Sequence, residues 1–130
     1  MPDKILVADD VADTLTLTKR ILEKYGLQVV TAVDGEEALL KAEAEIPDLI
    51  MLDWKMPKKD GVEVCKILKS QAKTKQIPIL LFSASANNPA ELVAEGGADG
   101  YLSKPFVIDL LITEVKKHLQ KNRDERYLNR

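Results

Sequence analysis

Five polar side chains stand at the ends of four short apolar runs of the sequence. They are Asp9, Asp10, Asp53, Ser83 and Lys104. Carboxylate oxygens are good ligands for Mg²⁺, which keeps room in its shell for water and phosphate oxygens. A lysine ammonium pairs with an anionic oxygen, and a serine hydroxyl hydrogen-bonds one. Brought together, these residues could bind Mg²⁺ and stabilise a phosphoryl group.

Each of these residues also has an ordinary structural explanation when it is taken alone. Asp9 and Asp10 could cap a helix that follows them, because an aspartate at a helix start satisfies free N–H groups. Asp53 could be a turn residue, and Lys104 with Pro105 could simply form part of a loop. The functional interpretation therefore depends on whether the fold brings the residues together.

Five apolar runs recur along the chain and are too short to be independent helices. They are Ile5–Ala8, Gln28–Ala32, Leu49–Leu52, Ile77–Phe82 and Gly100–Ser103. Most are rich in Ile, Val and Leu, and several are apolar at consecutive positions. This pattern predicts strands that are covered on both faces, as in a parallel sheet.

Segments with helical spacing alternate with these runs, which predicts an open parallel sheet with helices on both faces. Gly26 is expected to close the first helix, and residues 34–37 have the form of a capping box for the second. The apolar faces of the later helices contain Val62, Leu92 and Ile108. The segment 121–130 is expected to be a polar helix end or a frayed tail.

In a sheet of this kind, ligands bind beyond the carboxyl ends of the strands. Asp9 and Asp10 follow the first predicted strand, and Asp53 follows the third. Ser83 follows the fourth strand, and Lys104 follows the fifth. We therefore expect three carboxylates, a hydroxyl and an ammonium to gather at one edge of the sheet.

The composition sets the broad class. The chain has 130 residues, of which 45% are hydrophobic and 31% charged, with a net charge of -2. This favours one soluble, cytoplasmic domain without a nucleic-acid or membrane partner. Cys65, the only cysteine, excludes an internal disulfide and is expected in the core. His118, the only histidine, is expected on a solvated helix face.

Four segments together resemble the receiver domain of bacterial response regulators. They are Ile-Leu-Val-Ala-Asp9-Asp10, Leu-Ile-Met-Leu-Asp53-Trp-Lys-Met-Pro57 with Gly61, Leu-Leu-Phe-Ser83-Ala84 and Gly-Tyr101-Leu-Ser-Lys104-Pro105-Phe106. The resemblance implies a receiver domain over residues 1–120, followed by a polar tail over residues 121–130. It also implies an α/β, flavodoxin-like fold, with a parallel sheet of strand order 2-1-3-4-5 flanked by helices.

The resemblance further implies that Asp53 accepts a phosphoryl group from a sensor histidine kinase, a phosphotransfer protein or a small acyl phosphate. Asp10 and Asp53 would bind Mg²⁺ directly, Asp9 through a water, and Lys55 through its backbone carbonyl. Lys104 would pair with a phosphoryl oxygen. The only catalysis implied is that of the chain's own phosphorylation and dephosphorylation, so the protein is not expected to be an enzyme acting on other substrates.

Signal output is implied as well. Ser83 would hydrogen-bond the phosphoryl group, and Tyr101 would then move into the space that Ser83 vacates. The surface that changes would comprise the helix containing Leu92, the strand containing Tyr101 and the helix that starts near Phe106. A stand-alone domain would use this surface to bind a partner protein. A cis peptide bond before Pro105 is expected from the resemblance alone.

The lifetime of the phosphorylated form is expected to depend on two further residues. Lys55 and Ser85 lie two positions beyond Asp53 and Ser83, so they would flank the path of an attacking water. A long cation could screen the phosphoryl group, whereas a small hydroxyl leaves the path uncrowded. The direction of their combined effect is open.

Other functions fit the sequence less well. A haloacid-dehalogenase-type phosphohydrolase would have a second aspartate where Lys55 stands, and a cap domain. A flavodoxin-like FMN carrier would need a phosphate-binding loop where Asp9 and Asp10 would repel a phosphate. The chain could also be the receiver half of a transcription factor cut from a longer protein, which a longer coding sequence carrying an output domain after Leu119 would reveal. A degenerate receiver would lack part of the acidic, hydroxyl and lysine set, all of which is present.

Overall fold

The structure, a computed structural model, describes residues 2–84 and 88–128. Parallel strands form one sheet in the order β2-β1-β3-β4-β5, which confirms the predicted fold class. The strands are β1 (Lys4–Ala8), β2 (Gln28–Ala32), β3 (Leu49–Asp53), β4 (Ile79–Ser83) and β5 (Gly100–Ser103). The helices are α1 (Ala12–Lys24), α2 (Gly35–Glu45), α3 (Gly61–Ser70), α4 (Pro89–Gly96) and α5 (Ile108–Leu128).

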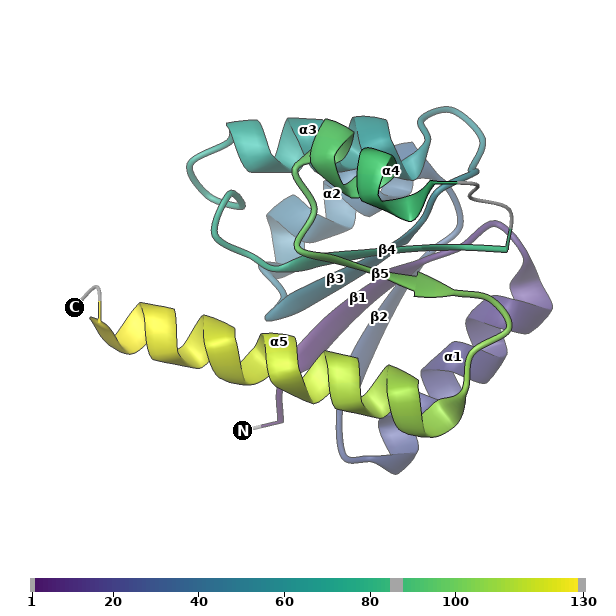
Figure 1. Cartoon of the computed structure of the whole chain (residues 1–130), viewed down its shortest axis with the longest axis horizontal. Coiled ribbons are helices and arrows are strands. Elements are labelled where there is room, and N and C mark those ends of the chain that lie inside the picture. Colours follow the sequence, from purple (N-terminus) through teal and green to yellow (C-terminus); the bar gives the residue numbers. More distant parts are fainter. Residues whose placement is uncertain (1, 85–87, 129–130) are drawn as a thin grey trace.

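The helices cover both faces of the sheet. Helices α2, α3 and α4 lie on one face, and α1 and α5 lie on the other (Figure 1). Successive strand residues enter two separate cores: Leu6 and Ile50 pack beneath α2 and α3, whereas Val7 and Met51 pack against α1 and α5. Because both faces are buried, the strands are apolar at consecutive positions.

Two predicted helix signals are present. Gly26 follows α1 with a φ of 85°, a backbone conformation that glycine adopts without strain. The Asp34 carboxylate accepts a hydrogen bond of 2.8 Å from the backbone N–H of Glu37 and caps α2. The Glu37 carboxylate accepts from the N–H of Val33, at 3.1 Å, so the capping box closes one residue earlier than expected.

Strand β4 begins at Ile79 and ends at Ser83, whereas the sequence pattern predicted residues 77–82. Pro78 has no N–H to donate to a ladder, and the N–H of Ile77 bonds the carbonyl of Thr74 in a turn. The apolar character of Ile77 comes from burial in the core rather than from a place in the strand. At its other end, β4 runs one residue further than predicted, so Ser83 is its last residue.

The predicted solvated position of His118 is wrong. Its side chain is buried, with 6% of the residue exposed, on the face of α5 that meets β5. Gly100 makes the room, because a Cβ atom there would lie 3.1 Å from the His118 Nε2. Within the described part of the chain, the buried His118 Nδ1 has no hydrogen-bond partner. Cys65 is buried, as predicted.

The last residues of the described chain continue α5 as far as Leu128. Asn122 is buried and donates a hydrogen bond of 3.2 Å to the backbone carbonyl of Asp48. Arg123 forms an ion pair of 2.6 Å with Asp3. Of the two forms expected for the end of the chain, the helix end is therefore observed through Leu128. Across residues 2–84 and 88–128, every helix is too short or too polar to cross a membrane.

Candidate metal and phosphoacceptor site

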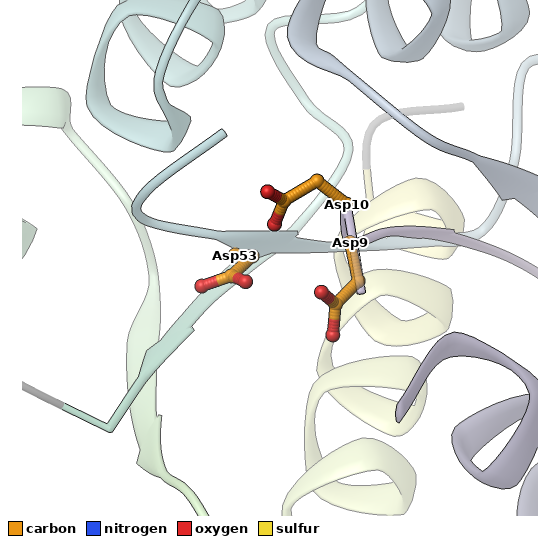
Figure 2. A group of neighbouring side chains, drawn as sticks. All are labelled: Asp9, Asp10 and Asp53. Atoms are coloured by element: carbon orange, nitrogen blue, oxygen red, sulfur yellow. The ribbon is translucent and has the colours of Figure 1, made fainter. Parts of the chain in front are cut away.

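Three aspartates meet at the carboxyl edge of the sheet, as predicted. Asp9 and Asp10 follow β1, and Asp53 is the last residue of the neighbouring strand β3. Figure 2 shows their side chains gathered where the two strands end, and one oxygen from each lies within 4.8 Å of the others. Asp9 and Asp53 are buried, whereas Asp10 is exposed. The cluster is therefore open to solvent on the side of Asp10.

The donor set fits Mg²⁺. Carboxylate oxygens are the hard ligands that this ion takes, and it binds through one or two of them while keeping waters and phosphate oxygens in its shell. A cluster with two buried carboxylates and one exposed carboxylate leaves room for such additional ligands. This fit rests on the three aspartate side chains alone. The backbone carbonyl of Lys55, the fourth expected ligand, does not enter it.

Lys104 reaches this cluster from the end of β5. Its Nζ lies 2.9 Å from Asp9 Oδ2 and 3.0 Å from Asp53 Oδ2, so one ammonium bonds two of the three carboxylates. The same Nζ lies 5.0 Å from the centre of the Phe82 ring, a contact that the sequence pattern does not predict. The peptide bond between Lys104 and Pro105 is cis, as expected. Lys104 thus compensates part of the repulsion among the aspartates.

Burial changes the acidity of this pair. Desolvation raises the pKa of Asp53 to about 6, although the hydrogen bond and charge of Lys104 oppose the shift. The neighbouring Asp9 charge raises the pKa of Asp53 further. Desolvation also lowers the pKa of Lys104, but the two bonded carboxylates outweigh it and the net pKa is raised. Near pH 7.5, a carboxylate at Asp53 therefore faces an ammonium at Lys104.

Asp9 combines a local structural role with its place in the cluster. Its Oδ1 accepts a hydrogen bond of 2.9 Å from the backbone N–H of Val11, and its Oδ2 accepts from Lys104. Val11 is the N-cap of α1, and its side chain forms no capping bond. The capping interpretation is therefore right only in part: Asp9 orders the turn before α1 and remains directed into the site.

The backbone around Asp53 is held closely on two sides. The N–H of Trp54 donates to the carbonyl of Phe82 at 2.9 Å, and the N–H of Gly61 donates to the carbonyl of Trp54 at 2.7 Å. A Cβ atom at Gly61 would overlap the carbonyl oxygen of Asp53. Position 61 therefore requires glycine, because the start of α3 packs directly on the backbone of Asp53.

Ser83 lies on the other side of the site, buried at the end of β4. Its backbone carbonyl accepts two hydrogen bonds, at 3.1 Å from the N–H of Lys104 and at 3.0 Å from the hydroxyl of Tyr101. The partly buried Tyr101 ring also packs against the core beneath α4. Ser83 is therefore joined both to the site lysine and to the tyrosine on β5. Ser85 lies outside the described residues.

The Lys55 side chain lies over the ring of Trp54. Its Nζ lies 5.0 Å from the centre of the Trp54 ring, in a cation–π arrangement. Trp54 itself packs partly buried against the core on the α2–α4 face. A side chain held on Trp54 borders the site without bonding Asp53.

The response regulator receiver domain family matches residues 5–116 of the chain. Among curated proteins, the chain is 50% identical over 107 residues to the alkaline phosphatase synthesis transcriptional regulatory protein PhoP of Bacillus subtilis. That alignment covers 82% of this chain and 44% of PhoP. The chain thus spans about half the length of the curated relatives it matches.

Solved structures agree with this match. The receiver domain of the Francisella response regulator 1452 is 37% identical, with a TM-score of 0.83 and coverage of 92% of this chain and 98% of that one. The receiver domain of the sensor histidine kinase PA1611 from Pseudomonas aeruginosa, solved with a magnesium ion in its active-site cleft, is 26% identical with a TM-score of 0.86. The alignment covers 99% of the PA1611 receiver domain and 92% of this chain. The chain belongs to the response regulator receiver domain family.

Proposed function

We propose that Asp53 is the phosphoacceptor of this receiver domain. The observation that carries the proposal is the placement of its carboxylate, at the end of β3, beside the oxygens of Asp9 and Asp10 and 3.0 Å from the Lys104 ammonium. Phosphorylation by a histidine kinase is the general function of the family. The donor would be such a kinase, a phosphotransfer protein or a small acyl phosphate.

Asp10 and Asp53 would hold Mg²⁺ directly, Asp9 through a water, and Lys55 through its backbone carbonyl. When bound, the ion would neutralise charge on the incoming phosphoryl group. The magnesium in the cleft of the PA1611 receiver supports this assignment. The three carboxylate oxygens within 4.8 Å of one another support it from this chain.

In the transfer, a carboxylate oxygen of Asp53 attacks phosphorus and a new O–P bond forms. The N–P bond of a phosphohistidine donor breaks, and its electron pair remains on the imidazole nitrogen. Lys104 would move its ammonium from Asp53 to a phosphoryl oxygen, which requires little displacement from a contact of 3.0 Å. Ser83 would donate its hydroxyl to another oxygen. Catalysis of this kind depends on positioning and charge stabilisation.

The output would be a change of surface. Ser83 and Tyr101 already share a hydrogen bond, so a movement of Ser83 toward the phosphoryl group would be passed to β5. We propose that the surface formed by α4, β5 and α5 then binds a downstream protein in the cytoplasm. The chain would modify only itself, through its own phosphorylation and dephosphorylation.

Acetyl phosphate with Mg²⁺ tests the proposal. The wild-type protein should gain the mass of one phosphoryl group, and hydroxylamine should remove it, because an acyl phosphate is labile to that nucleophile. Asp53→Asn should gain no mass, whereas Asp13→Asn, at an exposed aspartate in the first turn of α1, should behave as wild type. Modification that persists in Asp53→Asn would refute Asp53 as the acceptor.

A further inference from the structure

We propose that the N-terminus of α2 positions the metal site, and that Gly35 is the residue through which it does so. The link is the β3–α3 loop, residues 54–60, which leads from Asp53 to α3 and contains Lys55. The inference rests on the proposed Mg²⁺ site, because it concerns the placement of the Lys55 carbonyl. Helix α2 contributes none of the proposed ligands.

Gly35, the first residue of α2, lies against the backbone of this loop. Its N–H donates to the carbonyl of Pro57 at 3.4 Å, and the same carbonyl accepts from the N–H of Lys59 at 2.8 Å. A Cβ atom at Gly35 would lie 2.6 Å from the Lys59 Cβ and closer still to the Lys59 carbonyl oxygen. Because the nearest obstacle is backbone, a side chain at Gly35 would have to displace the loop.

A second contact between α2 and the loop passes through Lys58. The Lys58 backbone has a φ of 71°, in the left-handed region that is costly for a residue with a side chain. Its ammonium lies 3.6 Å from the carboxylate of Asp34, the N-cap of α2, and 3.9 Å from the carboxylate of Glu36 in the first turn. The unusual backbone conformation of Lys58 thus occurs where its side chain meets the start of α2.

The loop is therefore held at its beginning and in its middle. Gly61 and Phe82 bond the backbone of Trp54 at its beginning, as described above, and Gly35 packs on its middle. The first two contacts come from elements that adjoin Asp53. The contact at Gly35 comes from a helix on the far side of the loop, so it sets the position of the segment that follows Lys55. Outer contacts of this kind orient ligands and tune the affinity of a metal site.

Gly35→Ala tests the inference, and Gly26→Ala is the matched control. Gly26 has a φ of 85° with no atom within 4 Å of an added Cβ, so alanine there strains the backbone without touching the loop. Gly35→Ala should weaken Mg²⁺ binding by about tenfold. Gly26→Ala should lower the melting temperature and leave the Mg²⁺ dissociation constant unchanged. The Mg²⁺ dissociation constants of the two variants are measured by Trp54 fluorescence and, independently, by the Mg²⁺ dependence of the melting temperature.

Lys58→Met serves if Gly35→Ala does not fold. Lys58 is exposed, so the variant should fold, and the loss of a nearby positive charge would by itself favour a bound cation. Loss of the contact with α2 acts in the opposite direction. We expect weaker Mg²⁺ binding. Lys66→Met is the control, because Lys66 is equally exposed and loses a similar ion pair, with Glu95 at 3.5 Å.

Amide hydrogen exchange adds a readout that does not depend on phosphorylation. Since coupling is reciprocal, Mg²⁺ should slow exchange of the Gly35 N–H in the wild type and much less in Lys58→Met. Wild-type Mg²⁺ affinity in both Gly35→Ala and Lys58→Met, or stronger binding in Lys58→Met, would overturn the inference. A wild-type protein that binds no Mg²⁺ would instead overturn the proposed function.

Discussion

The hydroxyl of Tyr101 donates a hydrogen bond of 3.0 Å to the backbone carbonyl oxygen of Ser83. The residue proposed to contact the phosphoryl group and the residue proposed to change the output surface are thus directly joined across neighbouring strands. The same carbonyl accepts from the N–H of Lys104 at 3.1 Å. A displacement at Ser83 therefore alters the surroundings of both a site residue and a surface residue.

Ser83→Ala should still accept a phosphoryl group but lose most of the response at Tyr101. Asp53 and Lys104 remain in place, whereas the hydroxyl that would draw Ser83 toward the phosphoryl group is gone. Couplings of this kind are typically about 1–3 kcal/mol. The measurement is the change in Tyr101 amide exchange on adding beryllofluoride. Ser103→Ala, at the exposed serine paired with Ser83 on β5, is the control, and a full Tyr101 response in Ser83→Ala would contradict the prediction.

Asp10→Asn should stabilise the metal-free protein and weaken its response to Mg²⁺. Lys104 bonds Asp9 and Asp53, which leaves Asp10 outside these pairs at the exposed side of the cluster. Removing its charge should raise the free energy of unfolding of the metal-free protein by about 1 kcal/mol. The gain is small because solvent screens the repulsion of an exposed group. Mg²⁺ at about 100 times its dissociation constant should stabilise the wild type by ~2.7 kcal/mol. Urea unfolding with and without Mg²⁺ measures both effects, with Asp13→Asn as the control.

Mg²⁺ affinity should fall as the pH falls through about 6, because burial raises the pKa of Asp53 to about 6. A proton on this carboxylate competes with the metal, so binding at pH 5.5 should be about fourfold weaker than at pH 7.5. Titrations followed by Trp54 fluorescence at the two pH values test this. An affinity that does not change between pH 7.5 and pH 5.5 would show that Asp53 is already fully ionised at the lower pH.

His118 should make the fold less stable in mild acid. Desolvation lowers its pKa below the ordinary 6.5, although the charges of Glu114 and Asp99 oppose the shift. Well above pH 6.5 the ring is neutral in both the folded and the unfolded state, so the histidine takes nothing from the free energy of unfolding. As the pH falls below 6.5 the unfolded state takes up the proton first, so stability is lost until the folded pKa is passed.

The measurement is the free energy of unfolding in metal-free solution between pH 7.5 and pH 5. Asp53 acts in the opposite direction, because a carboxyl with a raised pKa favours the folded state as the pH falls through about 6. Asp53→Asn therefore serves as the background that removes this contribution. In that background, His118→Gln should flatten the remaining loss of stability. If the free energy of unfolding depends on pH equally with histidine and with glutamine at position 118, the loss of stability in mild acid does not come from His118.

Lys55→Ala should shorten the lifetime of the phosphorylated protein several-fold without preventing phosphorylation. The Lys55 side chain lies along Trp54 at the border of the site, with its Nζ 5.0 Å from the ring centre, and its removal opens the approach of water to Asp53. Decay of the phosphoprotein, followed by intact mass, measures the rate. Lys66→Ala is the control for loss of one surface charge, and equal decay of Lys55→Ala and wild type would count against the prediction.

Much of the fold and of the site follows from the sequence. The apolar runs define the strands because both faces of a parallel sheet are buried. Each site residue stands at the carboxyl end of a strand, and parallel strands place those ends along one edge. The order of elements alone therefore brings Asp9 near Asp53, which is 44 residues away along the chain. The family resemblance added what strand order does not contain, namely the cis bond before Pro105.

The tertiary structure decided what depends on contacts between distant residues. Lys104 bonds Asp9 across 95 positions, so the mutual repulsion of the aspartates is partly compensated. His118 stands after two lysines, Lys116 and Lys117, and its neighbours predict a solvated face, yet it is buried because Gly100 has no side chain on the opposing strand. Local pattern reports the average surroundings of a helix face, whereas the space available to one side chain is set by the residue packed against it.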